Sequence, residues 1–292
     1  MMKWMGLSAV LLVLASCSSP ASEETATEET GASEPLFTAP LGVQMYSFRN
    51  YYPDDQAGTL DRIKEMGFTE VEGDGGSLSP EAFRKMCDER GITIPATGAD
   101  FGELEKDPLA VVQKAKALGS TFVMCAWVPH NGDFTLADAQ KAVEVFNQSG
   151  KVLHDNGLTL CYHAHGYEFQ PYENETLLDY IIQNTDPQFV SFEMDIFWIQ
   201  FGGGDPVALM QKYGDRWKLL HLKDMKKGTE KDLTGGTSEE NNVVLGSGEL
   251  NMPAILKEAK RIGVAHYFIE DESSSVMEQV PQSIAYLRGL TE

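Results

Sequence analysis

The stretch LGVQMYSFRNYYPDD, residues 41–55, decides the fold. Its first seven residues, LGVQMYS, have the apolar character of a strand, and SFRNYYPDD then leads towards a helix. An open, doubly wound sheet would place a glycine-rich phosphate turn directly after its first strand. The segment 47–55 contains no glycine. The sequence therefore favours a closed barrel over the open sheet, provided that the rest of the chain alternates strand and helix.

The rest of the chain does alternate in this way. Strands are expected at residues 41–47, 69–73, 92–97, 121–127, 158–165, 189–195, 218–224 and 266–271. Helices are expected at residues 56–66, 80–90, 108–118, 136–156, 177–183, 206–213, 252–262 and 275–290. The strands are short and apolar through their middles, as parallel strands covered on both faces are. Eight such units in about 250 residues predict an α/β fold, a single-domain (β/α)8 TIM barrel.

The N-terminus has the pattern of an export signal. Residues 1–17, MMKWMGLSAVLLVLASC, combine Lys3 with a short apolar core and small residues before a cysteine. The last four of these residues resemble the lipobox of bacterial lipoproteins, which implies cleavage before Cys17 and lipidation of its thiol. Residues 18–40 are rich in Ser, Thr, Glu and Ala, and they are expected to form a flexible acidic tether. The barrel would then span 41–292, exported and anchored by lipid on the periplasmic side or cell surface.

Charge limits the class of partner. The chain has 44 acidic and 23 basic residues, a net charge of −21, and most of that charge lies in the barrel segment. Nucleic acid is excluded as a partner because its phosphates would be repelled, and a densely phosphorylated substrate is disfavoured for the same reason. The membrane is expected to be contacted only through the lipid. The three cysteines of the barrel, Cys87, Cys125 and Cys161, are expected to be buried thiols.

Polar side chains collect where the expected strands end. In a TIM barrel the catalytic groups come from the C-terminal ends of the strands and from the loops after them. In chain order these residues are Gln44, Tyr46, Arg49, Glu70, Glu72, Trp127, His130, His163, His165, Glu168, Glu193, Asp195, His221, Lys223, Asp224, Glu270, Asp271 and Glu272. Histidines and carboxylates crowded into one barrel mouth need a counter-charge, which a divalent cation supplies. Mixed imidazole and carboxylate ligands suit Mn²⁺, Zn²⁺, Co²⁺ or Fe²⁺ better than Ca²⁺.

The sequence resembles the xylose isomerase-like barrel superfamily, in its sugar phosphate isomerase/epimerase branch. LGVQMYSFR (41–49), YHAHGYEF (162–169), MDIFW (194–198), HLKD (221–224), LGSGELNMPAIL (245–256) and FIEDE (268–272) carry the resemblance. It implies a divalent metal held by a histidine of the seventh strand and by acidic residues of the fifth, sixth and eighth. By position these are His221, Asp195 and Glu270. Inosose dehydratase-like and 3-keto-glycoside-processing members resemble the fifth strand most closely.

The fourth ligand is expected to be Glu168, with His163 or His165 as the alternative. Many members have a glutamate where this chain has His163, and several have a histidine in the third strand, where this chain reads ATGADF (96–101). The endonuclease branch is not supported, because it needs a histidine-rich trinuclear zinc cluster and this chain has six histidines in all.

The resemblance implies a metal-dependent isomerase or epimerase that forms an enolate or enediolate from a small carbohydrate. His163 and His165 are the acid/base candidates, and Lys223 is a candidate to stabilise the developing oxyanion. Tyr46, Arg49, Glu72, Trp127 and Trp198 are the candidates for substrate binding. An exported protein without a phosphate loop is expected to act on an unphosphorylated sugar or keto-sugar.

Three other functions remain open. The same scaffold could host a 3-keto-glycoside lyase or hydratase, a non-catalytic sugar-binding lipoprotein, or an exported metal-dependent hydrolase. The binding protein would predict a broken metal set, whereas Asp195, His221 and Glu270 are all present. Oligomeric state is not indicated by any pattern in the sequence.

Overall fold

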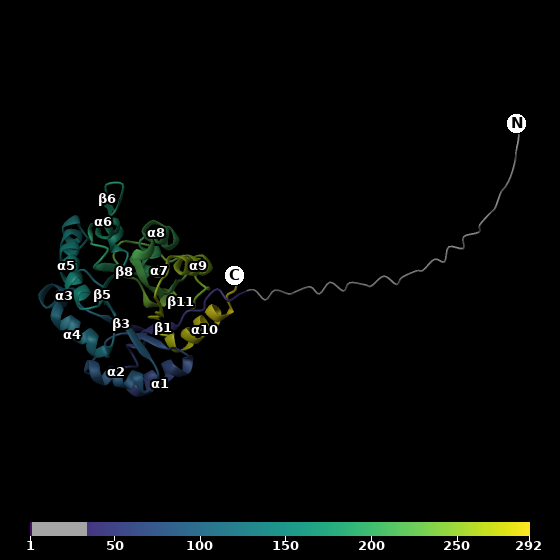
Figure 1. The fold of residues 1–292 in the computed structure, drawn as a ribbon, viewed down its shortest axis with the longest axis horizontal. Helices are drawn as coiled ribbons and strands as arrows, with labels where there is room; N and C mark the ends of the chain where they lie inside the picture. The colour runs from purple at the N-terminus through teal and green to yellow at the C-terminus, as the bar shows by residue number, and fades with distance from the viewer. Residues whose placement is uncertain (2–33) are drawn as a thin grey trace. The chain divides into compact units, whose positions relative to one another are not determined.

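The computed structural model describes residues 34–292 and Met1. In this part of the chain eight parallel strands close into a barrel, in the order β1-β12-β9-β8-β5-β4-β3-β2 (Figure 1). They are β1 (Leu41–Gln44), β2 (Glu70–Glu72), β3 (Thr93–Gly98), β4 (Phe122–Cys125), β5 (Thr159–His163), β8 (Val190–Asp195), β9 (Trp217–Leu222) and β12 (His266–Ile269). The predicted (β/α)8 barrel is confirmed, and each strand begins within one residue of its predicted start.

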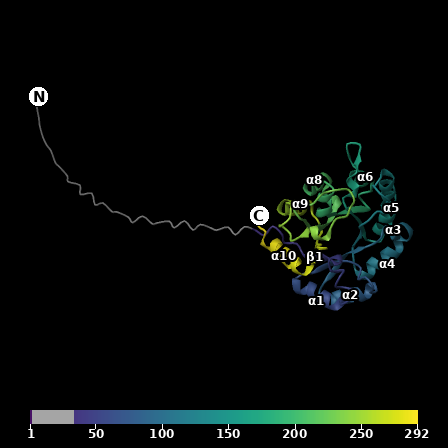
Figure 2. The ribbon, with the colours of Figure 1, turned by 180° about the vertical axis from the view of Figure 1, so that it is seen from behind.

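Helices surround the strands and follow one another round the barrel largely in chain order, which both views show (Figures 1 and 2). They are α1 (Gln56–Met66), α2 (Pro80–Asp88), α3 (Phe101–Lys106), α4 (Pro108–Leu118), α5 (Leu136–Asp155), α6 (Leu177–Asn184), α7 (Ile196–Phe201), α8 (Pro206–Tyr213), α9 (Met252–Ile262) and α10 (Val276–Gly289). Eight match the predicted helices, and the short α3 and α7 are additional. None of the helices in the described part of the chain is both long and apolar enough to cross a membrane.

Local signals explain where several helices begin. Ser79, Asp107 and Asp205 each accept a hydrogen bond from a backbone N–H of the first turn, and each precedes a proline at the first helical position. A capping side chain satisfies a donor that the helix leaves free, and proline has no N–H to satisfy there. The starts of α2, α4 and α8 are therefore fixed by the sequence itself.

Below the C-terminal ends of the strands, the barrel interior is filled by apolar side chains. Ala96, Cys161, Leu219 and Phe268 form a small buried cluster there, separate from the large core between strands and helices. Gly42 faces this cluster, and a Cβ at that position would lie 2.4 Å from the Phe268 ring. The glycine thus makes room for the ring that fills the barrel. Polar side chains lie instead at the C-terminal ends of the strands. Cys87, Cys125 and Cys161 are buried and free, as predicted.

The compact unit begins at Glu34, seven residues before the predicted boundary at residue 41. Pro35 forms a bridge with Thr291, and the backbone N–H of Leu36 donates to the carbonyl of Leu290. Leu36 is buried, so it anchors this segment against the C-terminus. The predicted signal (1–17), its Cys17 and the tether up to residue 33 lie outside the described residues.

Two short antiparallel pairs lie outside the barrel. They are β6 (Pro171–Tyr172) with β7 (Glu175–Thr176), and β10 (Asp224–Met225) with β11 (Asn242–Val243). The second pair closes a long loop that follows β9. Buried Asp224 accepts hydrogen bonds from the backbone N–H groups of Gly246, Gly248 and Leu250, which fixes the return of this loop.

Candidate metal centre and active site

The C-terminal ends of β5, β8 and β9 bring acidic and imidazole side chains to one place. The strand register sets His163 beside Glu193 and Asp195 beside His221. Glu270 follows the last residue of β12 directly. All five side chains are buried. The strand-end pattern seen in the sequence therefore corresponds to a real cluster in space.

Four buried atoms of this cluster have no hydrogen-bond partner: His163 Nε2, Glu193 Oε1, Asp195 Oδ2 and His221 Nδ1. Asp195 Oδ2 lies 3.9 Å from His163 Nε2 and 3.8 Å from His221 Nδ1. Glu270 Oε2 lies 3.3 Å from the same His221 nitrogen. Burying polar atoms without partners is costly, and a cation placed among them would satisfy them together. Two groups of three have the mutual spacing of a metal site: Asp195, His221 and Glu270, and His163, Glu193 and His221. The predicted ligands therefore fit a divalent ion.

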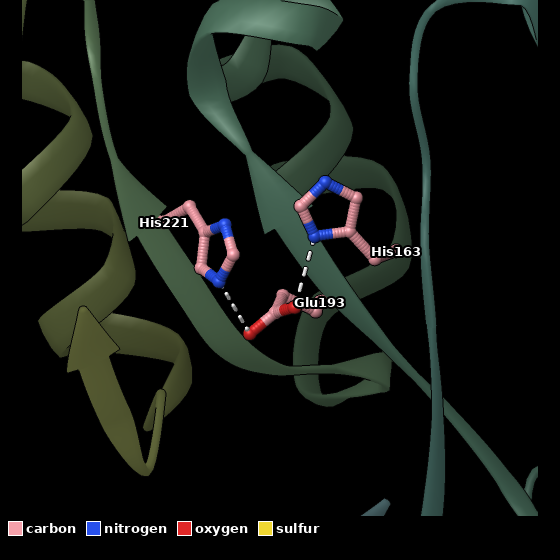
Figure 3. Close-up of side chains that lie close together, drawn as sticks. All are labelled: His163, Glu193 and His221. Carbon is pink, nitrogen blue, oxygen red and sulfur yellow. Dashed lines mark hydrogen bonds and ion pairs between the residues drawn. The ribbon is translucent and has the colours of Figure 1, made fainter. Parts of the chain in front are cut away.

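A deeper layer of carboxylates contacts the other imidazole nitrogens. Glu193 Oε2 lies 2.9 Å from His163 Nδ1, and Glu193 Oε1 lies 3.3 Å from His221 Nε2 (Figure 3). Glu72 Oε2 lies 2.6 Å from His221 Nε2 and accepts a hydrogen bond from Gln44 Nε2. Carboxylates in this position orient histidines that bind metals. Glu193 received no role in the sequence analysis, although it lies at a strand end there too.

These contacts shift the pKa values of the acidic and histidine side chains of the cluster in different directions. Burial would raise the pKa of Glu193, but the charges of His221 and His163 outweigh it and lower the pKa to about 2. Burial and the negative charge of Glu193 raise the pKa of Glu72 to about 7, although His221 opposes the rise. Burial opposes the protonation of His221, but Glu193 and Glu72 raise its pKa well above the usual range. In the metal-free protein, protonated His221 thus neutralises part of the cluster.

Lys223 is the second positive group of the cluster and is buried. Its Nζ lies 3.1 Å from Glu270 Oε2 and 3.9 Å from Asp195 Oδ2, and it donates a hydrogen bond to Glu272. Burial would lower the pKa of Lys223, but Glu270 and Asp195 raise it instead. Lys223 is not among the residues that line the cavity, and its ammonium contacts Glu270 and Glu272; its role as an oxyanion donor stays a prediction.

The structure does not bring Glu168 into the group of candidate ligands. It lies in a 3₁₀ turn, Tyr167–Phe169, just after β5. Its carboxylate accepts hydrogen bonds from the Tyr162 hydroxyl and from the backbone N–H of His165 at 3.1 and 3.2 Å. Those bonds turn the side chain back onto its own strand. The position facing Asp195 is taken by His163.

A cavity of about 470 Å³ opens directly above this cluster. It is lined by Gln44, Tyr46, Met124, Ala126, Trp127, His163, His165, Trp198, His221, Gly235, Gly236, Thr237, Glu239, Glu270 and Glu272. Tyr46 and Trp127 are among the few large apolar side chains in residues 34–292 that are exposed, at 53% and 42%. Their exposure at the rim provides flat apolar surfaces of the kind that sugar rings contact.

His165 stands in the aromatic wall of this cavity. Its ring centroid lies 5.4 Å from that of Trp198 and 5.7 Å from that of Trp127. Its Nδ1 has no hydrogen-bond partner. Burial lowers the pKa of His165 well below its usual range, and the nearby charges of His163 and Lys223 lower it further. His165 is therefore neutral at neutral pH, which leaves one ring nitrogen with a lone pair.

Two predicted substrate-binding residues lie outside the cavity wall. Glu72 is fully buried beneath His221. Arg49 donates to the backbone carbonyl of Glu272 at 2.8 Å and forms an ion pair with Glu239 at 2.6 Å. It thereby connects the loop after β12 with the long loop that carries Gly235.

That loop was not recognised in the sequence. Its Gly235 has a φ of +69°, and a Cβ there would lie 2.7 Å from the Tyr167 ring. The loop backbone therefore rests closely on the aromatic wall. The pair Gly235-Gly236 inside a polar segment was the available signal.

Similar sequences and structures among known proteins support the resemblance seen in the sequence. A family model described as xylose isomerase-like TIM barrel matches residues 60–290. The chain belongs to the xylose isomerase-like TIM barrel family. Among solved structures, a sugar phosphate isomerase/epimerase from Parabacteroides distasonis is 26% identical with a TM-score of 0.72, and the match covers 86% of this chain and 94% of that one.

Other members of the xylose isomerase-like family add detail. An inosose dehydratase from Geobacillus kaustophilus is 24% identical over 200 residues, which cover 61% of this chain and 64% of the relative. The chain spans less than two thirds of the length of the curated relatives it matches, and about a third of several. The IolI protein, solved with a bound zinc atom, is 13% identical with a TM-score of 0.66 over 85% of this chain and 96% of that one, which shows the shared fold alone.

The predicted resemblance is thus confirmed at the level of the family. Its neighbours are named as sugar isomerases, epimerases and dehydratases.

Proposed function

We propose that this protein is a metal-dependent enzyme that removes and returns a proton at a carbon next to the carbonyl of an unphosphorylated sugar. One observation carries the proposal. Unpartnered buried atoms of Asp195 and His221 face one another at the floor of a cavity whose wall holds a neutral histidine, His165. Metal ligands and a proton acceptor that share one cavity are the requirements of carbon-acid chemistry.

The chain's own groups divide the work. Asp195, His221 and Glu270 would hold the ion, and when bound it supplies positive charge that polarises the substrate carbonyl. His165 takes the proton from the neighbouring carbon, because its neutral ring faces the cavity. Lys223 holds Glu270 and Glu272 in place from behind.

The cavity wall supports an unphosphorylated substrate. Three carboxylates, those of Glu239, Glu270 and Glu272, line the cavity, and no lysine or arginine is among its described lining residues. Apart from His221 and the ion at its floor, the charged side chains that line the cavity would repel a phosphate. Sugar hydroxyls, in contrast, can donate hydrogen bonds to carboxylates while the ring packs on Trp127 or Tyr46. The polar and aromatic groups together fit a neutral sugar or keto-sugar.

Solvent exchange tests the shared proton-transfer step. Metal-loaded protein is incubated in D₂O with keto-sugars and 3-keto-glycosides, and each product is examined for deuterium by mass spectrometry. Deuterium at the carbon next to the carbonyl, or a primary isotope effect with substrate deuterated there, is the expected result. His165→Gln should lower turnover by about 10²–10⁴-fold if His165 is the general base. Turnover with neither signal would favour a hydrolase, and binding without turnover would favour a sugar-binding protein.

A second outcome of the same first step is elimination. The matches to inosose dehydratases favour this alternative, a lyase or hydratase on a keto-sugar or 3-keto-glycoside. After the proton is lost, departure of a β-hydroxyl or β-glycosyl group gives an unsaturated ketone, whereas reprotonation gives an isomer or epimer. Ultraviolet absorbance of the conjugated product distinguishes elimination from isomerisation in the same incubation.

We also propose that the protein is exported and lipid-anchored through Cys17. The support is the sequence pattern at residues 1–17 and the acidic stretch that follows it. A location outside the cytoplasm agrees with a cavity that has no lysine or arginine among its described lining residues to bind a phosphate.

A further inference from the structure

His163 is both a candidate ligand and a candidate base, and its surroundings decide between these roles. We propose that His163 binds the metal through Nε2 and that Glu193 is the positioning residue that presents it. The resulting centre has two imidazole and two carboxylate ligands and selects zinc-like ions over Mg²⁺ and Ca²⁺. This inference rests on the metal dependence proposed above and adds the fourth ligand, its support and the class of ion.

The hydrogen bond to Glu193 fixes which nitrogen of His163 carries a proton. Nδ1 lies 2.9 Å from Glu193 Oε2, and a carboxylate can only accept, so Nδ1 is the donor. In a neutral ring Nε2 then holds a lone pair. That nitrogen is buried, has no hydrogen-bond partner, and lies 3.9 Å from Asp195 Oδ2. A cation placed between these two facing acceptors would satisfy both of them.

His221 shows the same arrangement with its nitrogens exchanged. Its Nε2 lies 2.6 Å from Glu72 Oε2 and 3.3 Å from Glu193 Oε1, and its Nδ1 has no hydrogen-bond partner. When Nε2 carries the proton, the lone pair of Nδ1 faces Asp195 and Glu270. The two rings lie 4.7 Å apart at 65° and approach Glu193 from either side (Figure 3). One buried carboxylate thus contacts the outer nitrogen of both imidazoles.

The role of ligand fits His163 better than the role of base. Its free nitrogen points at Asp195 Oδ2, whereas the free nitrogen of His165 belongs to a ring in the aromatic cavity wall. A base whose lone pair is shared with a metal cannot also accept a substrate proton. The proposal therefore leaves His165 as the proton acceptor and gives His163 a structural task at the ion.

The donor set indicates the class of ion. Imidazole nitrogen suits Zn²⁺, Co²⁺, Fe²⁺ and Ni²⁺, whereas Mg²⁺ and Ca²⁺ prefer sites made of oxygen alone. Two imidazoles with Asp195 and Glu270 also balance the two positive charges of the ion. We therefore expect Zn²⁺ or Co²⁺ to bind far more tightly than Mg²⁺.

The matched control lies at the other end of the barrel. Glu70 Oε2 lies 2.8 Å from His266 Nδ1, a contact of nearly the same length as that between Glu193 and His163. Both of these control residues are at the N-terminal ends of their strands, away from the cluster. Glu70→Gln therefore repeats the chemical change of Glu193→Gln without touching the metal centre.

Metal titration tests the inference in the full folded chain. Zn²⁺ and Mg²⁺ affinities are measured by competition with a chelator for the wild type, Glu193→Gln, His163→Gln and Glu70→Gln. Glu193→Gln should weaken zinc binding about 10–100-fold, as removal of such supporting groups generally does, and Glu70→Gln should leave it unchanged. His163→Gln should weaken Zn²⁺ binding more than Mg²⁺ binding. Circular dichroism melts verify that each variant is folded.

Nitrogen NMR of the wild type gives a readout that needs no variant. With ¹⁵N-labelled histidine in the zinc form, His163 should carry its proton on Nδ1 and His221 on Nε2. X-ray absorption at the zinc edge should count two imidazoles in the wild type and one in His163→Gln. A zinc-loaded wild type with a single imidazole, or with His163 protonated on Nε2, overturns the inference while the proposed function stands. A wild type that binds no divalent ion overturns both.

Discussion

Lys223 offers the sharpest test of the electrostatic balance in the cluster. Its ammonium is buried and lies close to three carboxylates, those of Glu270, Glu272 and Asp195. Lys223→Met keeps much of the shape and removes the charge. Glu270 and Glu272 then lose their shared counter-charge in a place with little water, so the metal-free protein should be strongly destabilised.

The size of the effect follows from burial. Removing one partner of a buried ion pair typically costs about 3–5 kcal/mol, because the other charge remains uncompensated. A domain of this size loses roughly 2–4 °C in melting temperature per kcal/mol. The metal-stripped variant should therefore melt about 6–20 °C below the metal-stripped wild type. A divalent ion bound near Glu270 restores positive charge, so the variant should bind it more tightly than the wild type does. At equal free zinc, a tenfold lower Kd adds about 1.4 kcal/mol to the stability of the variant relative to the wild type.

The assay is thermal melting of stripped and zinc-loaded protein, followed by circular dichroism. Lys151→Met is the matched control, because Lys151 Nζ lies only 2.7 Å from Asp155 but both side chains are more than half exposed. That change should cost less than about 0.5 kcal/mol. If Lys223→Met melts within a degree of the wild type without metal, Lys223 is not the counter-charge of the cluster. If zinc fails to narrow the gap, the ion does not bind beside Glu270.

Three further outcomes are expected. Asp195→Asn should abolish metal binding, yet its melting temperature should stay near that of the stripped wild type, because an amide oxygen can still cap α7. Asp195→Ala should be about 1 kcal/mol less stable than Asp195→Asn in thermal melts, because it loses this cap. Stripped protein should gain stability from pH 8 to about pH 6.5, since the raised pKa values of Glu72 (about 7) and His221 make the folded state bind more protons than the unfolded chain. Below that pH the lowered pKa of His165 opposes the gain. Zinc-loaded protein should lose stability from pH 8 to pH 5 in calorimetry. Cys17→Ala should release the protein from membrane fractions on immunoblots, and unchanged association would contradict lipid anchoring.

The fold could be predicted because its signals are local. Each strand is short and apolar, and most helices carry a capping residue or a glycine stop that can be read from a few residues. The two helices that were not predicted lack the usual periodicity. In α7, five of six residues are apolar and buried, so no polar face marks it as a helix. In α3 the capping box of Asp100 and Glu103 was readable, but six residues are too few to show a repeat.

The candidate site was predicted only in part. The residues at which strands end can be predicted from their sequence neighbours, whereas the direction of a side chain in the turn that follows cannot. The rule that barrel sites lie at strand C-termini placed Asp195, His221 and Glu270 together, and the structure agrees. Glu168 lies past the end of β5, where a 3₁₀ turn directs its carboxylate to Tyr162. Lys223 directly follows the last residue of β9, and its ammonium contacts Glu270. Side-chain direction beyond the last strand residue cannot be obtained from spacing.

The choice between Glu193 and Asp195 shows what alternation alone leaves undecided. Both residues point into the barrel, because side chains two apart in a strand share a face. The register then sets Glu193 level with His163 and Asp195 level with His221, one layer higher. At the strand end, Asp195 uses Oδ1 to cap α7 and keeps Oδ2 free, whereas Glu193 has both oxygens within 3.3 Å of imidazole nitrogens. In the proposed centre, depth in the barrel, and not the type of acid, separates the ligand from the residue that positions the histidines. Exchanging the two acids should therefore abolish metal binding even though the composition is unchanged.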